Sequence, residues 1–232
     1  MASRVLAIGD IHGCDKALER LLAIVQPAED DTVVVLGDLI DRGTNSKCVI
    51  DRLLQLSRTV NLIGIMGNHD EMLLESLARG SPRMLWIGAG AMTTLDSYGG
   101  SLDQIPDEHV QFIRSLADYW QNETHIFVHA SVDPELPMEL QQTSTLRWTK
   151  LTGDDVPHCS GKIVICGHTS LAGGLPVVGN GFICINTKAY GGQWLTCLDV
   201  KSHLVWQANQ LGESHGPDLL NDVGVPFSLA GF

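Results

Sequence analysis

Five short apolar runs divide the chain, and hydrophobic and polar positions hardly alternate within them. The runs are Val5–Ile8, Thr32–Leu36, Asn61–Met66, His125–Val128 and Lys162–Cys166. A strand that is apolar at successive positions is buried on both faces, whereas a strand with one face in water alternates. The pattern therefore predicts strands in the middle of a covered sheet.

Helical patterns separate the first three runs. Residues Asp15–Val25 place Leu18, Leu21 and Val25 at helical spacing, and Ser46–Leu56 begins with a residue type that caps helices. Strand, helix, strand, helix and strand in this order predict βαβ units around a central sheet.

The rest of the chain mixes both patterns. Helices are expected at Ala91–Tyr98 and Asp107–Leu116, and adjacent strands at Gly181–Thr187, Leu195–Val200 and His203–Ala208. The periodicity fades from Asn209 onward. We therefore expect one domain over residues 1–208 and an irregular C-terminal tail over residues 209–232 that packs on the domain or trails from it.

Polar side chains follow the apolar runs at the point where each run ends. The segments are Gly9–Gly13, Gly37–Gly43, Gly67–Asp70, His129-Ala130 and Gly167–Thr169. In open α/β sheets the ligand crevice lies just beyond the carboxyl ends of the strands. One such segment alone is ordinarily a turn. Five in one chain predict a shared site.

The residue types in these segments suit two metal ions. Asp10 and His12 stand two positions apart and can converge on one cation, and Asp38 could bridge two cations with one carboxylate. The second site would be completed by Asn68, His129 and His168. Carboxylate oxygen with imidazole nitrogen favours two divalent ions of manganese, with iron or zinc as alternatives, over calcium or magnesium. Two such ions can clamp the attacking and leaving oxygens of a phosphoryl displacement.

Further residues in the same segments could act on a phosphate group. His69 is adjacent to Asn68, so it can protonate a leaving alkoxide as a general acid without being a ligand. Asp41 can accept the other N–H of His69, which fixes the tautomer and raises the pKa of the ring. Arg42 offers a planar fork for phosphate oxygens, and Asn68 lies where it could also contact them.

Composition limits the partners of the protein. Acidic residues number 27 and basic residues 15, which gives a formal charge of −12, and hydrophobic residues make up 44%. This balance argues against a nucleic acid or an anionic membrane surface as partner, and the hydrophobic content excludes wholesale disorder. Two divalent cations would reverse the local field, so a phosphate substrate remains compatible with the charge.

Several features point to a cytoplasmic protein. No apolar run approaches the roughly 20 residues of a membrane span. Asp10 and His12 interrupt the apolar start before a signal-peptide core could form. The six cysteines include no C-x-x-C pair, so we expect free thiols in a reducing compartment.

The strand-end motifs resemble those of the calcineurin-like metallophosphoesterase superfamily, and more closely its bacterial and phage serine/threonine phosphoprotein phosphatases. Gly9–Gly13, Gly37–Gly43 and Gly67–His69 match the three signature motifs in order, and His129 and His168 match the later histidines. The resemblance implies an α/β fold in which two mixed β-sheets form a sandwich flanked by helices. It also implies a catalytic domain over residues 1–208, with the active site at the carboxyl ends of the strands.

The resemblance also assigns roles to single residues. One metal ion would be held by Asp10, His12 and Asp38, the other by Asp38, Asn68, His129 and His168, and the acid dyad would be His69 with Asp41. Family members usually place a phosphate-binding arginine two residues after a tryptophan in a later loop. Here Lys150 stands at that position after Trp148, and Arg147 precedes the tryptophan. Lys150 is the expected second phosphate clamp, with Arg147 as the alternative.

The leading hypothesis is a protein serine/threonine phosphatase acting on a phosphorylated protein or peptide. In it, a water or hydroxide bridging two metal ions attacks the phosphate, and His69 is the general acid. The alternative is a symmetrical dinucleoside tetraphosphate hydrolase, a family that usually lacks the acid found here as Asp41 and carries a helical cap between its late histidines. A non-catalytic scaffold of the same fold would normally lose ligands or His69, and all of them are present.

Overall fold

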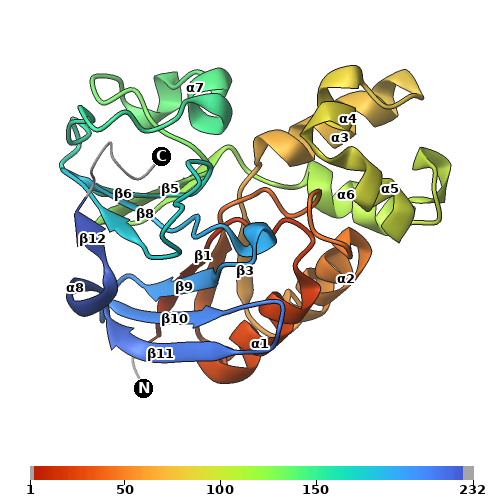
Figure 1. Cartoon of the computed structure of the whole chain (residues 1–232). Coiled ribbons are helices and arrows are strands. Elements are labelled where there is room, and N and C mark those ends of the chain that lie inside the picture. Colours follow the sequence, from red (N-terminus) through yellow and green to blue (C-terminus); the bar gives the residue numbers. More distant parts are fainter. Residues whose placement is uncertain (1–2, 227–232) are drawn as a thin grey trace.

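Two six-stranded mixed β-sheets pack against each other at the centre of the molecule (Figure 1). The computed structural model describes residues 3–226. The first sheet has the strand order β11-β10-β9-β1-β2-β3 and the second β12-β7-β8-β6-β5-β4. The first sheet consists of β1 (Val5–Ile8), β2 (Thr32–Val35), β3 (Asn61–Gly64), β9 (Leu195–Asp199), β10 (Leu204–Ala208) and β11 (Ser214–Leu219). The second consists of β4 (Tyr119–Gln121), β5 (His125–Val128), β6 (Ile163–Cys166), β7 (Val177–Val178), β8 (Phe182–Cys184) and β12 (Val225–Pro226).

The strands that carry the predicted site run parallel within each sheet. In the first sheet β1, β2 and β3 are parallel, and in the second β5, β6 and β8 are parallel. Their carboxyl ends therefore open toward the same region of the molecule. This arrangement confirms the predicted sandwich of two mixed sheets.

Successive side chains of the central strands enter two different apolar layers. Leu6 and Ile8 of β1 pack with the helices α1 (Asp15–Val25) and α2 (Ser46–Leu56) on the outer face of the first sheet. Ala7 of the same strand packs between the two sheets, in one cluster with Phe127 of β5. Both faces of β1 are buried, which explains why hydrophobic and polar residues do not alternate along it.

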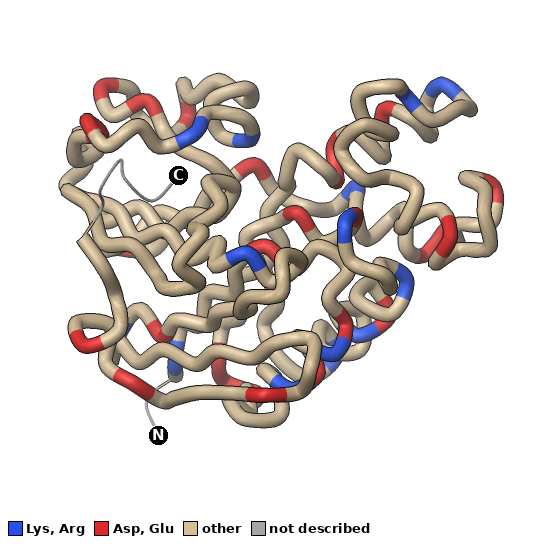
Figure 2. Tube along the Cα trace, viewed as in Figure 1, with Lys and Arg blue, Asp and Glu red and all other residues tan. Residues whose placement is uncertain are grey.

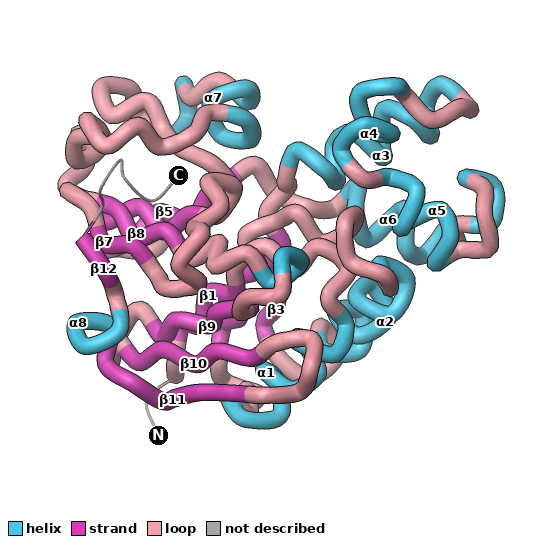
Figure 3. Tube along the Cα trace, viewed as in Figure 1, coloured by secondary structure: helices cyan, strands magenta, loops and turns pink. Residues whose placement is uncertain are grey.

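The remaining helices lie in two groups on either side of the strand ends (Figure 1). One group contains α3 (Asn68–Arg79), α4 (Met84–Ala89), α5 (Ala91–Ser97) and α6 (Asp107–Arg114), and the other is the short α7 (Thr143–Trp148). Shorter elements are α8 (Leu220–Val223) and the 3-10 turns η1 (Leu102–Gln104), η2 (Met138–Leu140) and η3 (Ala189–Gly191). Figure 3 shows that many of the loops gather between the two helical groups.

The chain after Asn209 differs from the expected irregular tail. Strand β11 pairs with β10, and β12 crosses to pair with β7 of the second sheet. Most side chains of β11 and β12 are exposed, so these strands are held by backbone pairing. Their sequences lack the apolar periodicity from which a strand is predicted. Residues 227–232 of the predicted tail lie outside the described residues. The division of the chain at residue 208 stays a prediction.

The structure also shows where the charges and the cysteines lie and how apolar the helices are. Figure 2 shows acidic positions spread over the molecule, with basic positions interspersed among them. All six cysteines are free, and four of them are buried. Within residues 3–226, no helix is both long enough and apolar enough to cross a membrane.

Candidate active site

The segments after β1, β2, β3, β5 and β6 bring their polar side chains into one buried cluster, and the segment after β3 includes the first turn of α3. All of these segments except the last contribute side chains that are at most 5% exposed, namely Asp10, His12, Asp38, Asp41, Asn68, His69 and His129. The loop after β6 adds His168, which is half-buried. The structure thus assembles the residues that the strand-end motifs singled out.

The first half of the cluster is formed by Asp38 with His12 and His69. The His12 Nε2 atom lies 3.3 Å from Asp38 Oδ2, and the His69 Nε2 atom lies 4.0 Å from the same oxygen. The backbone oxygen of Ile40 can only accept, so His12 Nδ1 donates to it at 2.9 Å and Nε2 keeps its lone pair. Burial lowers the pKa of His12 to about 3, so its ring is neutral.

The second half joins both sheets through Asp38. The other Asp38 oxygen, Oδ1, lies 3.4 Å from His129 Nε2, and Asn68 Oδ1 lies 3.1 Å from both His129 Nε2 and His168 Nδ1. His129 Nδ1 donates to the backbone oxygen of Leu36 at 2.7 Å, which leaves Nε2 facing the cluster. Burial lowers the pKa of His129 and brings the pKa of His168 to about 4, so these rings are neutral too.

Asp10 lies in the same cluster but faces different partners. Its carboxylate accepts the His168 backbone N–H at 3.1 Å and the side-chain amide of Asn186 at 2.6 Å. Asp10 is absent from the two groups of donor atoms that lie within 4.8 Å of one another, which are His12–Asp38–His69 and Asp38–His129–His168. Burial, together with the charge of Asp38, raises the pKa of Asp10. Sequence reasoning did not assign the contact of Asn186, because 176 positions separate it from Asp10.

This donor set fits divalent metal ions. Asp10 and Asp38 are buried carboxylates with 2% exposure each, and neutral imidazole nitrogens of His12 and His129 lie beside Asp38. Buried carboxylates need a cation or protonation, and the lone pairs of the rings point at the same space. Oxygen and nitrogen donors in this mixture suit first-row transition metals or zinc.

Asp41 and His69 form a buried pair beside the candidate metal cluster. The His69 Nδ1 atom lies 2.6 Å from Asp41 Oδ2. Burial disfavours the charged ring, but the neighbouring Asp38 and the hydrogen bond to Asp41 outweigh it, and the pKa of His69 is raised. Asp41 also accepts hydrogen bonds from Trp86 and Thr94, two residues to which the sequence assigned no role.

Arg42 reaches over the cluster from the loop after β2. Its Nη1 and Nη2 atoms lie 3.1 Å from the Nε2 atoms of His12 and His69, and a guanidinium only donates, so both rings accept here. The guanidinium carbon also stacks 4.5 Å above the ring of Tyr190. Arg42 is exposed at the mouth of the site, where a phosphate oxygen could replace the rings as acceptor.

The two candidates for a second phosphate clamp have different surroundings. Arg147 donates to Glu71 Oε1 at 2.5 Å and also pairs with Asp118, and the indole of Trp148 donates to Glu71 Oε2 at 2.7 Å. Lys150 is exposed, and its charge contributes to the lowered pKa of His168. The structure therefore leaves Lys150 available beside the site, whereas carboxylates already occupy Arg147.

Several site residues have a backbone in the left-handed region of φ and ψ. The φ angles of five non-glycine site residues are positive: His12 46°, Asp38 49°, Asp41 71°, Arg42 66° and His168 56°. Such angles are uncommon outside glycine and persist only where the surroundings enforce them. One enforcing contact is the carboxylate of Asp70, which accepts the backbone N–H groups of Leu39 and Gly67 at 3.1 Å and so ties two loops together.

Comparisons with known proteins agree with this geometry. The family model for calcineurin-like phosphoesterases matches residues 3–170. A symmetrical bis(5'-nucleosyl)-tetraphosphatase of Acidovorax ebreus is 48% identical over 69 residues, which are 29% of this chain and 24% of that protein. Its counterpart in Paracidovorax citrulli is 32% identical over 164 residues, which are 65% of this chain and 52% of that protein. The chain thus spans about half of the length of these relatives or less.

Solved structures show the same fold at low identity. A protein provisionally named a diadenosine tetraphosphatase superposes with a TM-score of 0.67 at 23% identity, covering 88% of this chain and 92% of that one. A serine/threonine phosphatase of Saccharomyces cerevisiae superposes with a TM-score of 0.60 at 15% identity, covering 87% and 74%. Both confirm the predicted sandwich, and the family model covers well over half of the chain. The chain therefore belongs to the calcineurin-like phosphoesterase family.

Proposed function

We propose that this protein is a divalent-metal-dependent hydrolase that cleaves dinucleoside tetraphosphates symmetrically into two nucleoside diphosphates. The observation that carries the proposal is the similarity to the symmetrical bis(5'-nucleosyl)-tetraphosphatases, which reaches 32% identity over 65% of this chain. The proposal reverses the order of the two hydrolase hypotheses that the sequence suggested.

The cations around the site support a substrate with several phosphates. Arg42 stands on one side, in the loop after β2, and Lys150 stands on the other, after α7. Within residues 3–226, neither side chain forms an ion pair with a carboxylate, in contrast to Arg147. A chain of four phosphates offers anionic oxygens to both cations at once, whereas a single phosphate group offers fewer.

The residues of the site divide into metal ligands and groups that act on the substrate. The ions would be held by Asp10, His12, Asp38, Asn68, His129 and His168. When bound, they would supply positive charge to the transferred phosphoryl group and acidify the attacking water. His69 would pass a proton from Nε2 to the leaving oxygen while Asp41 holds Nδ1. The fork of Arg42, with Asn68 beside it, would orient the phosphate oxygens.

A phosphoserine or phosphothreonine residue is the second candidate substrate, and two observations favour it. The 2.6 Å contact of Asp41 with His69 suits protonation of an alkoxide, which is a poor leaving group, more than release of a nucleoside diphosphate. The chain between residues 130 and 167 contains only the turn η2 and the short helix α7, so this interval does not form the helical cap expected of the tetraphosphate hydrolases.

Turnover with supplied Mn²⁺ decides between the two substrates. We expect a larger kcat/KM for diadenosine tetraphosphate than for a phosphothreonine peptide, with two molecules of ADP from each dinucleotide on anion-exchange chromatography. Formation of ATP and AMP would contradict symmetrical cleavage, and faster turnover of the peptide would favour the second candidate. The Asp38→Asn variant, prepared in the same way, controls for contaminating phosphatases.

A further inference from the structure

Asp41 is held from a part of the chain that lies outside the strand-end motifs. We call α4 and α5, residues 84–97, the helical arm. The indole Nε1 of Trp86 donates to Asp41 Oδ2 at 2.7 Å, and the hydroxyl of Thr94 donates to Asp41 Oδ1 at 2.6 Å. With the Nδ1 atom of His69 on Oδ2, both oxygens of the carboxylate are occupied.

The backbone of Asp41 is engaged by the same residues. Its N–H donates to Thr94 Oγ1 at 2.9 Å and to Ser46 Oγ at 3.1 Å, and the two hydroxyls lie 2.9 Å apart. One consistent assignment satisfies every group: Ser46 donates to Thr94, and Thr94 donates to the carboxylate. Asp41, Ser46, Trp86 and Thr94 all have an exposure of 0%. Water therefore cannot replace any of these hydrogen bonds when one is lost.

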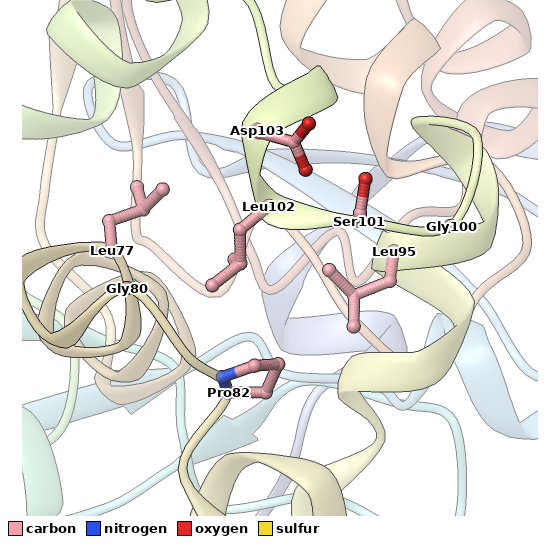
Figure 4. A pocket seen from close by; sticks show the side chains of 8 residues that line it. All are labelled: Leu77, Gly80, Pro82, Leu95, Gly100, Ser101, Leu102 and Asp103. Carbon is pink, nitrogen blue, oxygen red and sulfur yellow. The ribbon is translucent and has the colours of Figure 1, made fainter.

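Packing on the other sides of the helical arm is incomplete. A cavity of about 400 Å³ lies between the end of α3 and the segment from α5 to η1, lined by Leu77, Pro82, Leu95 and Leu102 among others (Figure 4). On the outer side, Met84 is 80% exposed and Met92 is 50% exposed. The arm is therefore held from its inner side, where Trp86 and Leu95 are buried in the main apolar core and Trp86 and Thr94 also bind Asp41.

We propose that Trp86 and Thr94 are positioning residues for the acid His69, and that they act by fixing the orientation of the Asp41 carboxylate. A carboxylate held at both oxygens cannot rotate, so its Oδ2 atom stays directed at His69 Nδ1. The ring of His69 then keeps Nε2 directed toward the substrate. This inference rests on the proposed hydrolase activity for its kinetic test, but it does not depend on which phosphate compound is the natural substrate.

The test compares Thr94→Val, which removes the hydroxyl at nearly constant volume, with Thr94→Ser, which keeps it. With an alkyl phosphate, we expect Thr94→Val to lower kcat by roughly 10–100-fold with little change in KM. With an aryl phosphate, whose leaving group needs no proton, the loss should shrink to a few-fold. Thr94→Ser should restore most of the activity. An equal loss for both leaving groups would overturn the inference, because it would indicate general damage to the site.

A second measurement does not need the reaction. In the metal-free protein labelled with ¹⁵N-histidine, the Nδ1 proton of His69 should give a strongly downfield NMR signal. We expect the signal to move or broaden in Thr94→Val and in Trp86→Phe, and to stay in place in Thr94→Ser. An unchanged signal in the first two variants would overturn the inference. A wild-type enzyme that ignores dinucleoside tetraphosphates would refute the proposed substrate instead, and the NMR comparison would still decide this point.

Discussion

We call the buried strand-end side chains the floor of the site, the helical arm its first wall, and residues 143–150 its second wall. Contacts of different kinds hold the two walls in place. On one wall, Trp86 and Thr94 of the helical arm make buried hydrogen bonds to Asp41. On the other, Arg147 is held by an ion pair with Glu71 in which the side chains are 15% and 24% exposed. A buried polar group is costly to leave without a partner, whereas a partly exposed ion pair contributes little net stability. We therefore expect the first wall to be held more rigidly than the second.

The largest effect should come from a change at Asp38 in the floor, because this residue belongs to both groups of candidate metal ligands. Asp38 reaches His12 with one oxygen and His129 with the other. We expect Asp38→Asn to lose both metal ions and to lower turnover by roughly 10⁴-fold or more, at or beyond the upper end of what one positioned group supplies. Atomic absorption of the purified protein and turnover with added Mn²⁺ check this.

Metal removal gives the matched control for that change. Treatment of the wild type with a chelator should abolish activity, and added Mn²⁺ should restore it, whereas Asp38→Asn should not recover at any Mn²⁺ concentration. Full activity in metal-free wild type would contradict a metal-dependent mechanism.

A change at the first wall should have the next largest effect. If His69 is an acid and not a ligand, His69→Asn should keep its metal content and lose roughly 10²–10³-fold in kcat on an alkyl phosphate. The loss should be smaller on an aryl phosphate. Asp41→Asn should show the same dependence on the leaving group more weakly, because Asp41 would act on the reaction only through His69. Loss of one metal ion in His69→Asn would show that the ring is a ligand.

A change at the second wall should have the smallest effect. We expect Lys150→Ala to raise KM for a polyphosphate substrate roughly 3–10-fold at nearly constant kcat, since an exposed cation contributes about 1 kcal/mol. Lys150→Arg should preserve KM. Arg147→Ala should leave kcat and KM nearly unchanged and lower Tm only slightly, because its ion pairs with Glu71 and Asp118 are partly exposed. If folded Arg147→Ala loses its turnover while Lys150→Ala keeps it, Arg147 and not Lys150 is the second phosphate-binding residue.

The same contrast explains what the sequence could predict. The floor was predictable because each candidate ligand follows an apolar strand within a few residues, so its place depends on local pattern and on the parallel order of the strands. The boundaries Val5–Ile8, Asp15–Val25 and Ser46–Leu56 were predicted as the structure has them. Those elements lie on strongly periodic or uniformly apolar segments, where local pattern and burial agree.

The walls could not be predicted in the same way. Thr94 lies 53 positions from Asp41, and Glu71 lies 76 positions from Arg147. Local periodicity cannot predict either contact over such distances along the chain. A threonine on a helix is ordinary, and only the packed fold shows that its hydroxyl meets a buried carboxylate. Lys150 and Arg147 are equivalent as charges in the sequence, and they differ only through the acidic side chains that the fold brings beside one of them.

The left-handed backbone of the site also has a consequence for the stability of the chain. At His12, Asp38, Asp41, Arg42 and His168, a side chain is kept where glycine would relieve about 1–2 kcal/mol of strain per residue. Mutations to glycine at these positions thus combine a release of strain with the loss of a reactive group. The side chains at these five positions therefore cost stability that glycine would recover, which is the usual trade between stability and activity.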